Sequence, residues 1–139
     1  MTRRLFVDTA VLALAVGGEH PLRAACRSLI EAASSGSVEL HASAELVQEF
    51  CFHRLRRTTR ADAVAQARDV AALCVLHPVD ADVVDGMLGL VETTRLGGRD
   101  AIHAATALLH GFDAIVTPDL DFDGIPGLRR RDPSAWSAM

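Results

Sequence analysis

Four acidic residues that lie far apart in the chain adjoin apolar runs or open a helical segment. Asp8 ends the first apolar run, and Asp119 comes two residues after the apolar run 114–117. Asp100 opens a segment of small residues with helical periodicity, and Glu49 lies beside the apolar stripe of another such segment. Carboxylates placed in this way can bind a divalent cation or act as general bases. These four residues are therefore the first candidates for chemistry.

Each of these acids also has an ordinary structural explanation. Asp8 and Asp100 could be helix N-caps, which is a common role for aspartate. Glu49 could be a solvated residue at the edge of a helix, and Asp119 and Asp121 could belong to an acidic loop. For each residue taken alone, both explanations stay open.

Two glutamates in the segment 44–56 compete for the inward position. The apolar stripe of this segment is formed by Leu46, Val47, Phe50 and Cys51. Glu49 falls at the edge of the stripe, about 60° around the helix from Leu46. Glu45 lies near the start of the helix, where the helix dipole stabilises a carboxylate. We therefore predict that Glu49 points inward and that Glu45 stabilises the helix start.

The elements that must position these acids follow from the alternation of short β-like runs with longer helical segments. This pattern predicts one α/β domain over residues 1–139 with a mainly parallel sheet. Strands are expected at 4–7, 38–42, 74–77 and 114–117, with a fifth around 128–130. Helices are expected at 21–33, at 44–56 with Ser43 as N-cap, at 61–72, at 81–95 with Asp80 as N-cap, and at 101–110, after a helical turn at 11–16. Because parallel strands end at one edge of a sheet, Asp8 and Asp119 should meet there, with Asp100 nearby.

A group of carboxylates held together must be protonated or neutralised by a cation. Carboxylate oxygens are hard ligands, so the cation expected at this edge is Mg²⁺, with Mn²⁺ as the alternative. The cysteines Cys26, Cys51 and Cys74 are widely spaced and include no Cys-x-x-Cys pair. We therefore expect no zinc site, and we predict reduced thiols in a cytoplasmic protein.

The composition excludes several other classes of protein. All 14 basic residues are arginine, which removes phosphatases of the haloacid dehalogenase type and phosphorylated receiver domains, because both need a lysine. The net charge of -4 argues against binding nucleic acid by an overall positive field, although local arginine clusters remain available. The apolar runs are too short to cross a bilayer, and Asp8 interrupts the run in which a signal peptide would continue. We expect neither membrane insertion nor export.

Four stretches of the chain carry a set of motifs. They are Leu5-Phe6-Val7-Asp8-Thr9, the segments 43–50 and 98–107, and Ile115-Val116-Thr117-Pro118-Asp119-Leu120-Asp121-Phe122. With these motifs the sequence resembles a PIN-domain protein, and specifically the VapC-type ribonuclease toxins of bacterial toxin-antitoxin pairs. The most specific part is the motif Asp-Ala-x-x-x-Ala-x-Ala that begins at Asp100, followed by Thr-x-Asp-x-Asp-Phe from Thr117.

The resemblance implies a three-layer α/β/α domain with a mainly parallel sheet of about four to five strands. It also implies an acidic quartet around the metal, formed by Asp8, Glu49, Asp100 and Asp119. Asp121 matches an accessory acid that varies in the family, and it is expected as a further metal ligand. Glu49 lies six residues after Ser43, which is the spacing seen in the family and supports Glu49 over Glu45.

The same resemblance implies hydrolysis of RNA phosphodiester bonds to 5′-phosphate and 3′-hydroxyl ends. It implies two protein partners as well: a small VapB-like antitoxin that holds the enzyme inactive, and a second copy of the chain in a homodimer. The alternative is a nuclease-like domain that binds RNA or a partner protein without cleaving. The intact acids favour cleavage.

Other polar residues are weaker candidates. Thr9 and Thr117 adjoin the acids and could orient them or could be ordinary turn and strand residues. An arginine cluster follows the Glu49 helix and consists of Arg54, Arg56 and Arg57. These arginines could contact an RNA backbone or could be a solvated helix end. His103 and His110 share a helix face, where histidines are more often packed or exposed than ligands.

Overall fold

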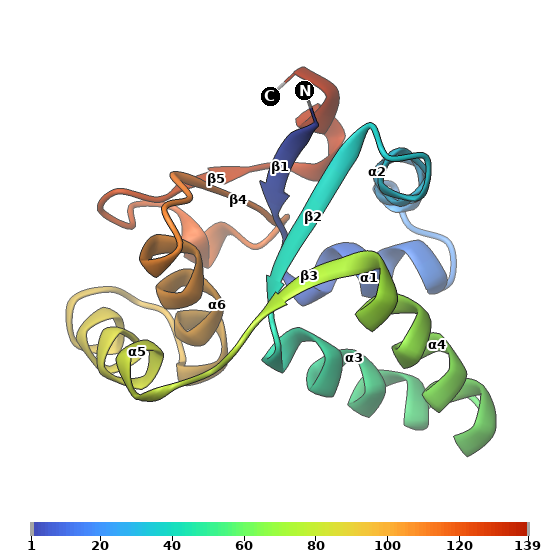
Figure 1. Cartoon of the computed structure of the whole chain (residues 1–139), viewed down its shortest axis with the longest axis horizontal. Coiled ribbons are helices and arrows are strands. Elements are labelled where there is room, and N and C mark those ends of the chain that lie inside the picture. The colour runs from blue at the N-terminus through green and yellow to red at the C-terminus, as the bar shows by residue number, and fades with distance from the viewer. Residues whose placement is uncertain (1, 139) are drawn as a thin grey trace.

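Five short parallel strands separate two groups of helices in the computed structural model, which describes residues 2–138 (Figure 1). The strands are β1 (Arg3–Phe6), β2 (Val38–Ser43), β3 (Cys74–His77), β4 (Ala114–Val116) and β5 (Arg129–Arg131). The α-helices are α1 (Thr9–Val16), α2 (Arg23–Ser34), α3 (Glu45–Leu55), α4 (Arg60–Leu73), α5 (Ala81–Thr93) and α6 (Gly98–Leu109). Two 3₁₀ helices follow, η1 (Leu120–Phe122) and η2 (Pro133–Ala138).

The strands form two sheets that meet at one point. β2 is the central strand of a parallel sheet with β1 and β3 on either side, and β4 and β5 form a parallel pair. Within residues 2–138 a single parallel bridge between Val7 and Val116 joins β1 to β4, and the Asp8 amide donates to the Val116 carbonyl at 3.1 Å. The strand order is therefore β3-β2-β1-β4-β5. The expected mainly parallel sheet is confirmed, and the ends of β1 and β4 lie side by side.

Helices cover both faces of the sheet. Consecutive residues at the end of β1 point to opposite faces. Val7 belongs to an apolar core that also contains Leu40 and Phe50, on the side of α1 to α4. Phe6 belongs to a second core with Ile115, on the side of α5 and α6 (Figure 1). Burial of each large side chain in these cores stabilises the fold by about 1.5–3 kcal/mol, and the three-layer α/β/α arrangement is confirmed.

The small residues of α6 let this helix approach the sheet and α5 closely. Ala101, Ala104 and Ala107 are completely buried. Gly86 of α5 faces Ala105, where an added Cβ would lie only 3.3 Å from the alanine Cβ. The close approach brings the first turn of α6 to the edge of the sheet where β1 and β4 end.

Several element boundaries differ from those expected. The turn expected at 11–16 is part of the full helix α1, and the helix expected at 21–33 begins at Arg23. Helix α6 begins at Gly98 with Gly97 as N-cap, so Asp100 lies in the first turn and is not the cap. Glycines are tolerated there because the first N–H groups of a helix have no intrahelical partner.

Of the caps expected at two other helices, the one at α5 is confirmed and the one at α3 is wrong. Asp80 caps α5, and its side chain accepts a hydrogen bond from the Val83 amide at 3.0 Å. The N-cap of α3 is Ala44 rather than Ser43. The Ser43 hydroxyl still accepts from the Glu45 amide at 3.2 Å, which is the kind of hydrogen bond that a capping serine makes.

The cysteines are free, as expected, at Cys26, Cys51 and Cys74. Burial raises the pKa of the thiols of Cys26 and Cys74 to about 11, so neither supplies a thiolate nucleophile. In the part of the chain that the structure describes, every helix is too short or too polar to cross a membrane.

Candidate active site

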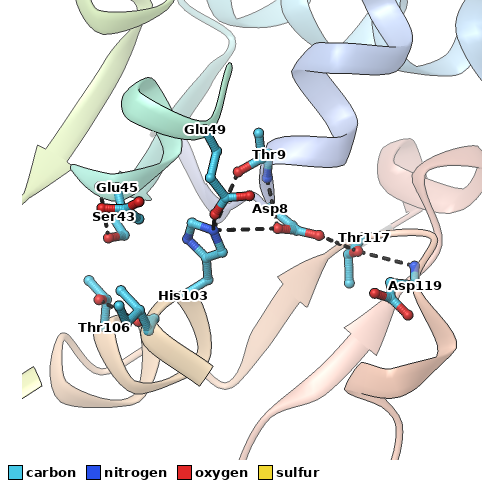
Figure 2. Close-up of polar contacts among 10 residues, drawn as sticks. Asp8, Thr9, Ser43, Glu45, Glu49, His103, Thr106, Thr117 and Asp119 are labelled. Atoms are coloured by element: carbon cyan, nitrogen blue, oxygen red, sulfur yellow. Dashed lines mark hydrogen bonds and ion pairs between the residues drawn. The ribbon is translucent and has the colours of Figure 1, made fainter. Parts of the chain in front are cut away.

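Asp8 lies at the junction of β1 and α1, and both of its carboxylate oxygens are hydrogen-bonded. Oδ1 accepts from the Thr9 amide at 2.8 Å, which caps α1. Oδ2 accepts from the Thr117 hydroxyl at 2.9 Å and so connects the ends of β1 and β4 (Figure 2). Burial raises the pKa of Asp8, and the nearby His103 and the Thr117 hydrogen bond only partly oppose this. Asp8 is thus a helix cap and also a member of a buried polar group.

Glu49 on α3 turns its carboxylate inward toward His103 on α6. Glu49 is 8% exposed, and its Oε1 lies 2.6 Å from Nε2 of His103. The same nitrogen lies 3.3 Å from the Thr9 hydroxyl and 3.8 Å from Oδ1 of Asp8. Figure 2 shows the side chains of Glu49, Asp8 and Thr9 directed toward the imidazole, whereas Glu45 lies beside Ser43.

Asp100 lies in the first turn of α6 and is half-buried. Burial raises its pKa to about 6, and the charges of Asp8, Asp119 and Glu49 add to the effect. Neighbouring carboxylates can act on it in this way only if they are close. The structure therefore gathers the four acids that the sequence singled out at one edge of the sheet.

Thr117 connects Asp119 to Asp8. Its hydroxyl accepts a hydrogen bond from the Asp119 amide at 3.1 Å while it donates to Asp8. Asp119 caps η1 by accepting from the Asp121 amide at 2.9 Å. Asp121 is exposed, and its carboxylate lies 3.4 Å from the Arg95 guanidinium. The structure thus brings Thr9 and Thr117 into contact with the acids but directs Asp121 away from them.

His103 is a member of this polar group that the sequence interpretation passed over. The sequence places it on one helix face with His110, but His110 is exposed with its ring tilted against that of His77, whereas His103 is completely buried. Burial acts to lower the pKa of His103, but the Glu49 hydrogen bond and the charges of Asp8 and Glu49 outweigh it and raise the pKa. The available signal was its position three residues after Asp100, which places both residues on one side of the helix.

The chemistry of the group fits a hard divalent cation. Its oxygen donors are carboxylates and hydroxyls, and the raised pKa values of Asp8 and Asp100 reflect burial that a bound dication would offset. Within residues 2–138 no three His, Cys, Asp or Glu side chains are already arranged around one point. Because His103 Nε2 contacts both Glu49 and Asp8, side-chain movements are required before all the acids can share one ion.

The arginines expected to contact RNA lie at the end of α3 and just beyond it. The Arg54 guanidinium donates to Gln66 on α4 at 2.8 Å, and that of Arg56 lies 5.5 Å from the centre of the Phe52 ring. A groove of about 430 Å³ runs between this end of α3 and the loop after α1. Its charged and histidine side chains are Glu19, His20, His53, Arg54 and Arg57.

Comparison with known proteins assigns the chain to one family. The PIN domain profile matches residues 5–128, so the chain belongs to the PIN-domain family. It is 36% identical over 121 residues to Ribonuclease VapC7 of Mycobacterium tuberculosis, an alignment that covers 85% of this chain and 83% of that protein. It is 31% identical over 129 residues to Ribonuclease VapC13 of the same species, covering 91% and 98%. Its relatives within the family are therefore VapC ribonucleases.

Solved structures share the fold at lower sequence identity. VapBC2 from Rickettsia felis, bound to a DNA fragment of its promoter, superimposes with a TM-score of 0.73 at 15% identity over 93% of this chain and 98% of that chain. A toxin-antitoxin complex from Klebsiella pneumoniae superimposes with a TM-score of 0.69 at 21% identity over 93% and 97%. These similarities confirm the PIN-like α/β/α architecture.

Proposed function

We propose that this protein is a metal-dependent endoribonuclease toxin that hydrolyses RNA phosphodiester bonds to 5′-phosphate and 3′-hydroxyl ends. One observation carries the proposal: four acids converge where β1 and β4 end, in a chain whose relatives are named ribonucleases. Such a group of acids suits phosphodiester hydrolysis because this reaction needs a cation at the phosphate and an activated water.

The acids have distinct roles in this proposal. Asp8, Asp100 and Asp119 would hold Mg²⁺, or Mn²⁺ as the alternative, with Glu49 as a further ligand. Asp121 would join them as an accessory acid only by leaving Arg95, with which it is paired in this structure. When bound, such an ion polarises the scissile phosphate and lowers the pKa of a coordinated water. Because its pKa is about 6, Asp100 is mostly ionised above pH 7 and is available as a carboxylate.

The two threonines would keep the acids in position. Thr117 holds one oxygen of Asp8 and the backbone of Asp119 with the same hydroxyl. Thr9 fixes the other oxygen of Asp8 through its amide. These hydrogen bonds order the carboxylates before RNA arrives, so that less conformational entropy is lost on binding.

The RNA backbone is proposed to contact the arginines near the end of α3. Arg54 and Arg57 line the groove beside this end, and Arg56 is exposed next to Phe52. Arginine suits this contact because its guanidinium can bind two phosphate oxygens at once. Phosphate contacts position an RNA but do not read its sequence.

The proposed partners are a VapB-like antitoxin and a second copy of the chain, in a cytoplasmic assembly. The support is the similarity to solved structures, which are toxin-antitoxin complexes from Klebsiella pneumoniae and VapBC assemblies from other bacteria. An antitoxin that covers the acids would keep the enzyme inactive until the antitoxin is removed.

Cleavage of a structured RNA tests the proposed function. The purified protein should cut the RNA with Mg²⁺ or Mn²⁺ and should lose activity in EDTA. Asp8→Asn and Asp100→Asn should each lower the cleavage rate by about 100-fold or more, because each removes a charge from the cation site. Asp85→Asn is the matched control, since Asp85 is exposed on α5, and its rate should stay within about twofold of wild type.

Two results would count against this proposal. Cleavage that persists in EDTA, or in both site variants, would exclude these acids from the chemistry. Saturable RNA binding without cleavage under any metal condition would instead favour the alternative, a nuclease-like domain that binds without cutting.

A further inference from the structure

His103 is a buried titratable residue to which the proposed chemistry gives no task. It is 0% exposed and lies on α6, one turn after Asp100. Three oxygen atoms from different residues converge on its Nε2, at 2.6 Å from Glu49, 3.3 Å from Thr9 and 3.8 Å from Asp8. The shortest of these contacts has the length of a charge-assisted hydrogen bond.

The surroundings of the second ring nitrogen indicate which nitrogen of His103 carries the proton. Nδ1 is buried and has no hydrogen-bond partner within the described residues 2–138. Without an acceptor at Nδ1, the proton of the neutral ring belongs on Nε2, where Glu49 accepts it. Nε2 is also a donor in the imidazolium, so this hydrogen bond to Glu49 forms whichever charge the ring carries.

Glu49 depends on this donor for its direction. Glu49 is 8% exposed, and its hydrogen bond to His103 is the contact that directs its carboxylate toward Asp8. A buried carboxylate without a donor is costly, and a glutamate has enough rotatable bonds to turn away. Loss of His103 would therefore let Glu49 leave the acidic group.

We propose that His103 is a positioning residue, which holds the Glu49 carboxylate beside Asp8 by donating its Nε2–H to Oε1. The inference rests on the proposed function, in which Glu49 is a ligand of the divalent cation. His103 itself touches neither the RNA nor the cation in this proposal and acts only through Glu49.

Two substitutions of similar polarity separate this role from packing. The amide nitrogen of glutamine in His103→Gln can reach the place of Nε2, whereas that of asparagine in His103→Asn reaches only the place of Nδ1. Mn²⁺ affinity, measured by electron paramagnetic resonance titration, should fall about 10- to 100-fold in His103→Asn. In His103→Gln it should stay within about threefold of wild type, because the donor is retained.

A double-mutant cycle with Glu49→Gln tests whether His103 acts through Glu49. Glu49→Gln alone should weaken Mn²⁺ binding, and adding His103→Asn should weaken it by no more than about twofold further. The inference is overturned if His103→Asn binds Mn²⁺ as wild type does, or if the two losses simply add.

A measurement on the wild type covers the case in which His103→Asn does not fold. Nitrogen-15 spectra of the metal-free protein should place the ring proton of His103 on Nε2, and this resonance should shift in Glu49→Gln. A neutral ring with its proton on Nδ1 would overturn the inference, as would a wild type that binds no Mn²⁺. A wild type that binds Mn²⁺ but cuts no RNA would instead count against the proposed function, while the ratio of Mn²⁺ affinities still decides the role of His103.

Discussion

Asp100 is the acid whose charge depends most visibly on its neighbours. Burial, together with Asp8 and Asp119, raises its pKa to about 6 from an ordinary value of 3.8. The folded protein therefore binds this proton more tightly than the unfolded chain does. The resulting stability is fully present below about pH 4 and is lost as the pH rises through 6.

Asp100→Asn should remove this dependence on pH. In EDTA, the free energy of unfolding of wild type relative to Asp100→Asn should fall as the pH rises from 4 to 7. The expected change is about 1 kcal/mol, which allows for the partial exposure of the side chain. Urea denaturation at several pH values measures it, with Asp85→Asn as the exposed control. A difference that stays constant between pH 4 and 7 would contradict the coupling of Asp100 to its neighbours.

The sequence could predict the direction of a side chain only where helix or strand periodicity determines it. The inward direction of Glu49 followed from the helical stripe, and the meeting of Asp8 and Asp119 followed from parallel strands. The contact of His103 with Glu49 joins α6 to α3 across 54 residues, and no local pattern encodes such a distance. The outward direction of Asp121 depends on its pairing with Arg95, which is equally nonlocal.

At the scale of elements, a row of histidines joins β2, β3 and the end of α6. His41 Nδ1 lies 2.9 Å from His77 Nε2, and the rings of His77 and His110 are 4.1 Å apart between centres. At the other side of the ring, Glu39 accepts from His41 Nε2 at 2.6 Å, and the Arg4 guanidinium lies 3.3 Å from Nε2. Protonation of His77 would place further positive charge near Arg4.

Lowering the pH should reduce the stability of the fold through His77 in this row. Burial, with His110, His41 and Arg4, lowers the pKa of His77. The unfolded chain then takes up this proton first, so stability is lost as the pH falls below about 6.5. His77→Gln should reduce the drop in Tm between pH 7.5 and 5 by on the order of 3 °C. Calorimetry measures the drop, and equal drops in wild type, His77→Gln and the control His53→Gln would contradict this account.

The order and kind of most elements could be predicted because short β-like runs alternate with longer helical segments along the chain. Asp80 capped α5 as expected, whereas the starts of α3 and α6 moved by one or more residues. Helix starts depend on a few hydrogen bonds that compete closely, so a glycine or alanine can serve where a polar cap is expected. The two separate sheets were not predicted, because their separation depends on a single bridge.

At the scale of the whole molecule, the acidic group should make stability depend on metal. A cation that binds the folded chain and not the unfolded one stabilises it in proportion to the logarithm of its concentration. At about ten times Kd, Mg²⁺ or Mn²⁺ should raise Tm by roughly 3–5 °C in wild type. Differential scanning fluorimetry checks this, and Asp8→Asn should show less than half of the gain. Equal gains in both proteins would indicate metal binding elsewhere.

The joint between the two sheets bears on how the spacing of the acids can adjust. Asp8 continues from the three-stranded sheet, and Asp119 follows the two-stranded one, yet the backbone link between them is the Val7–Val116 bridge and the adjoining Asp8 amide. Both apolar cores cross this joint, because Phe6 of β1 shares one core with Ile115 of β4, and Val7 shares the other with Val116. The two backbones are therefore held at a set distance by buried packing on both faces of the joint, and a bound ion can adjust the gap between the carboxylates only through their side chains.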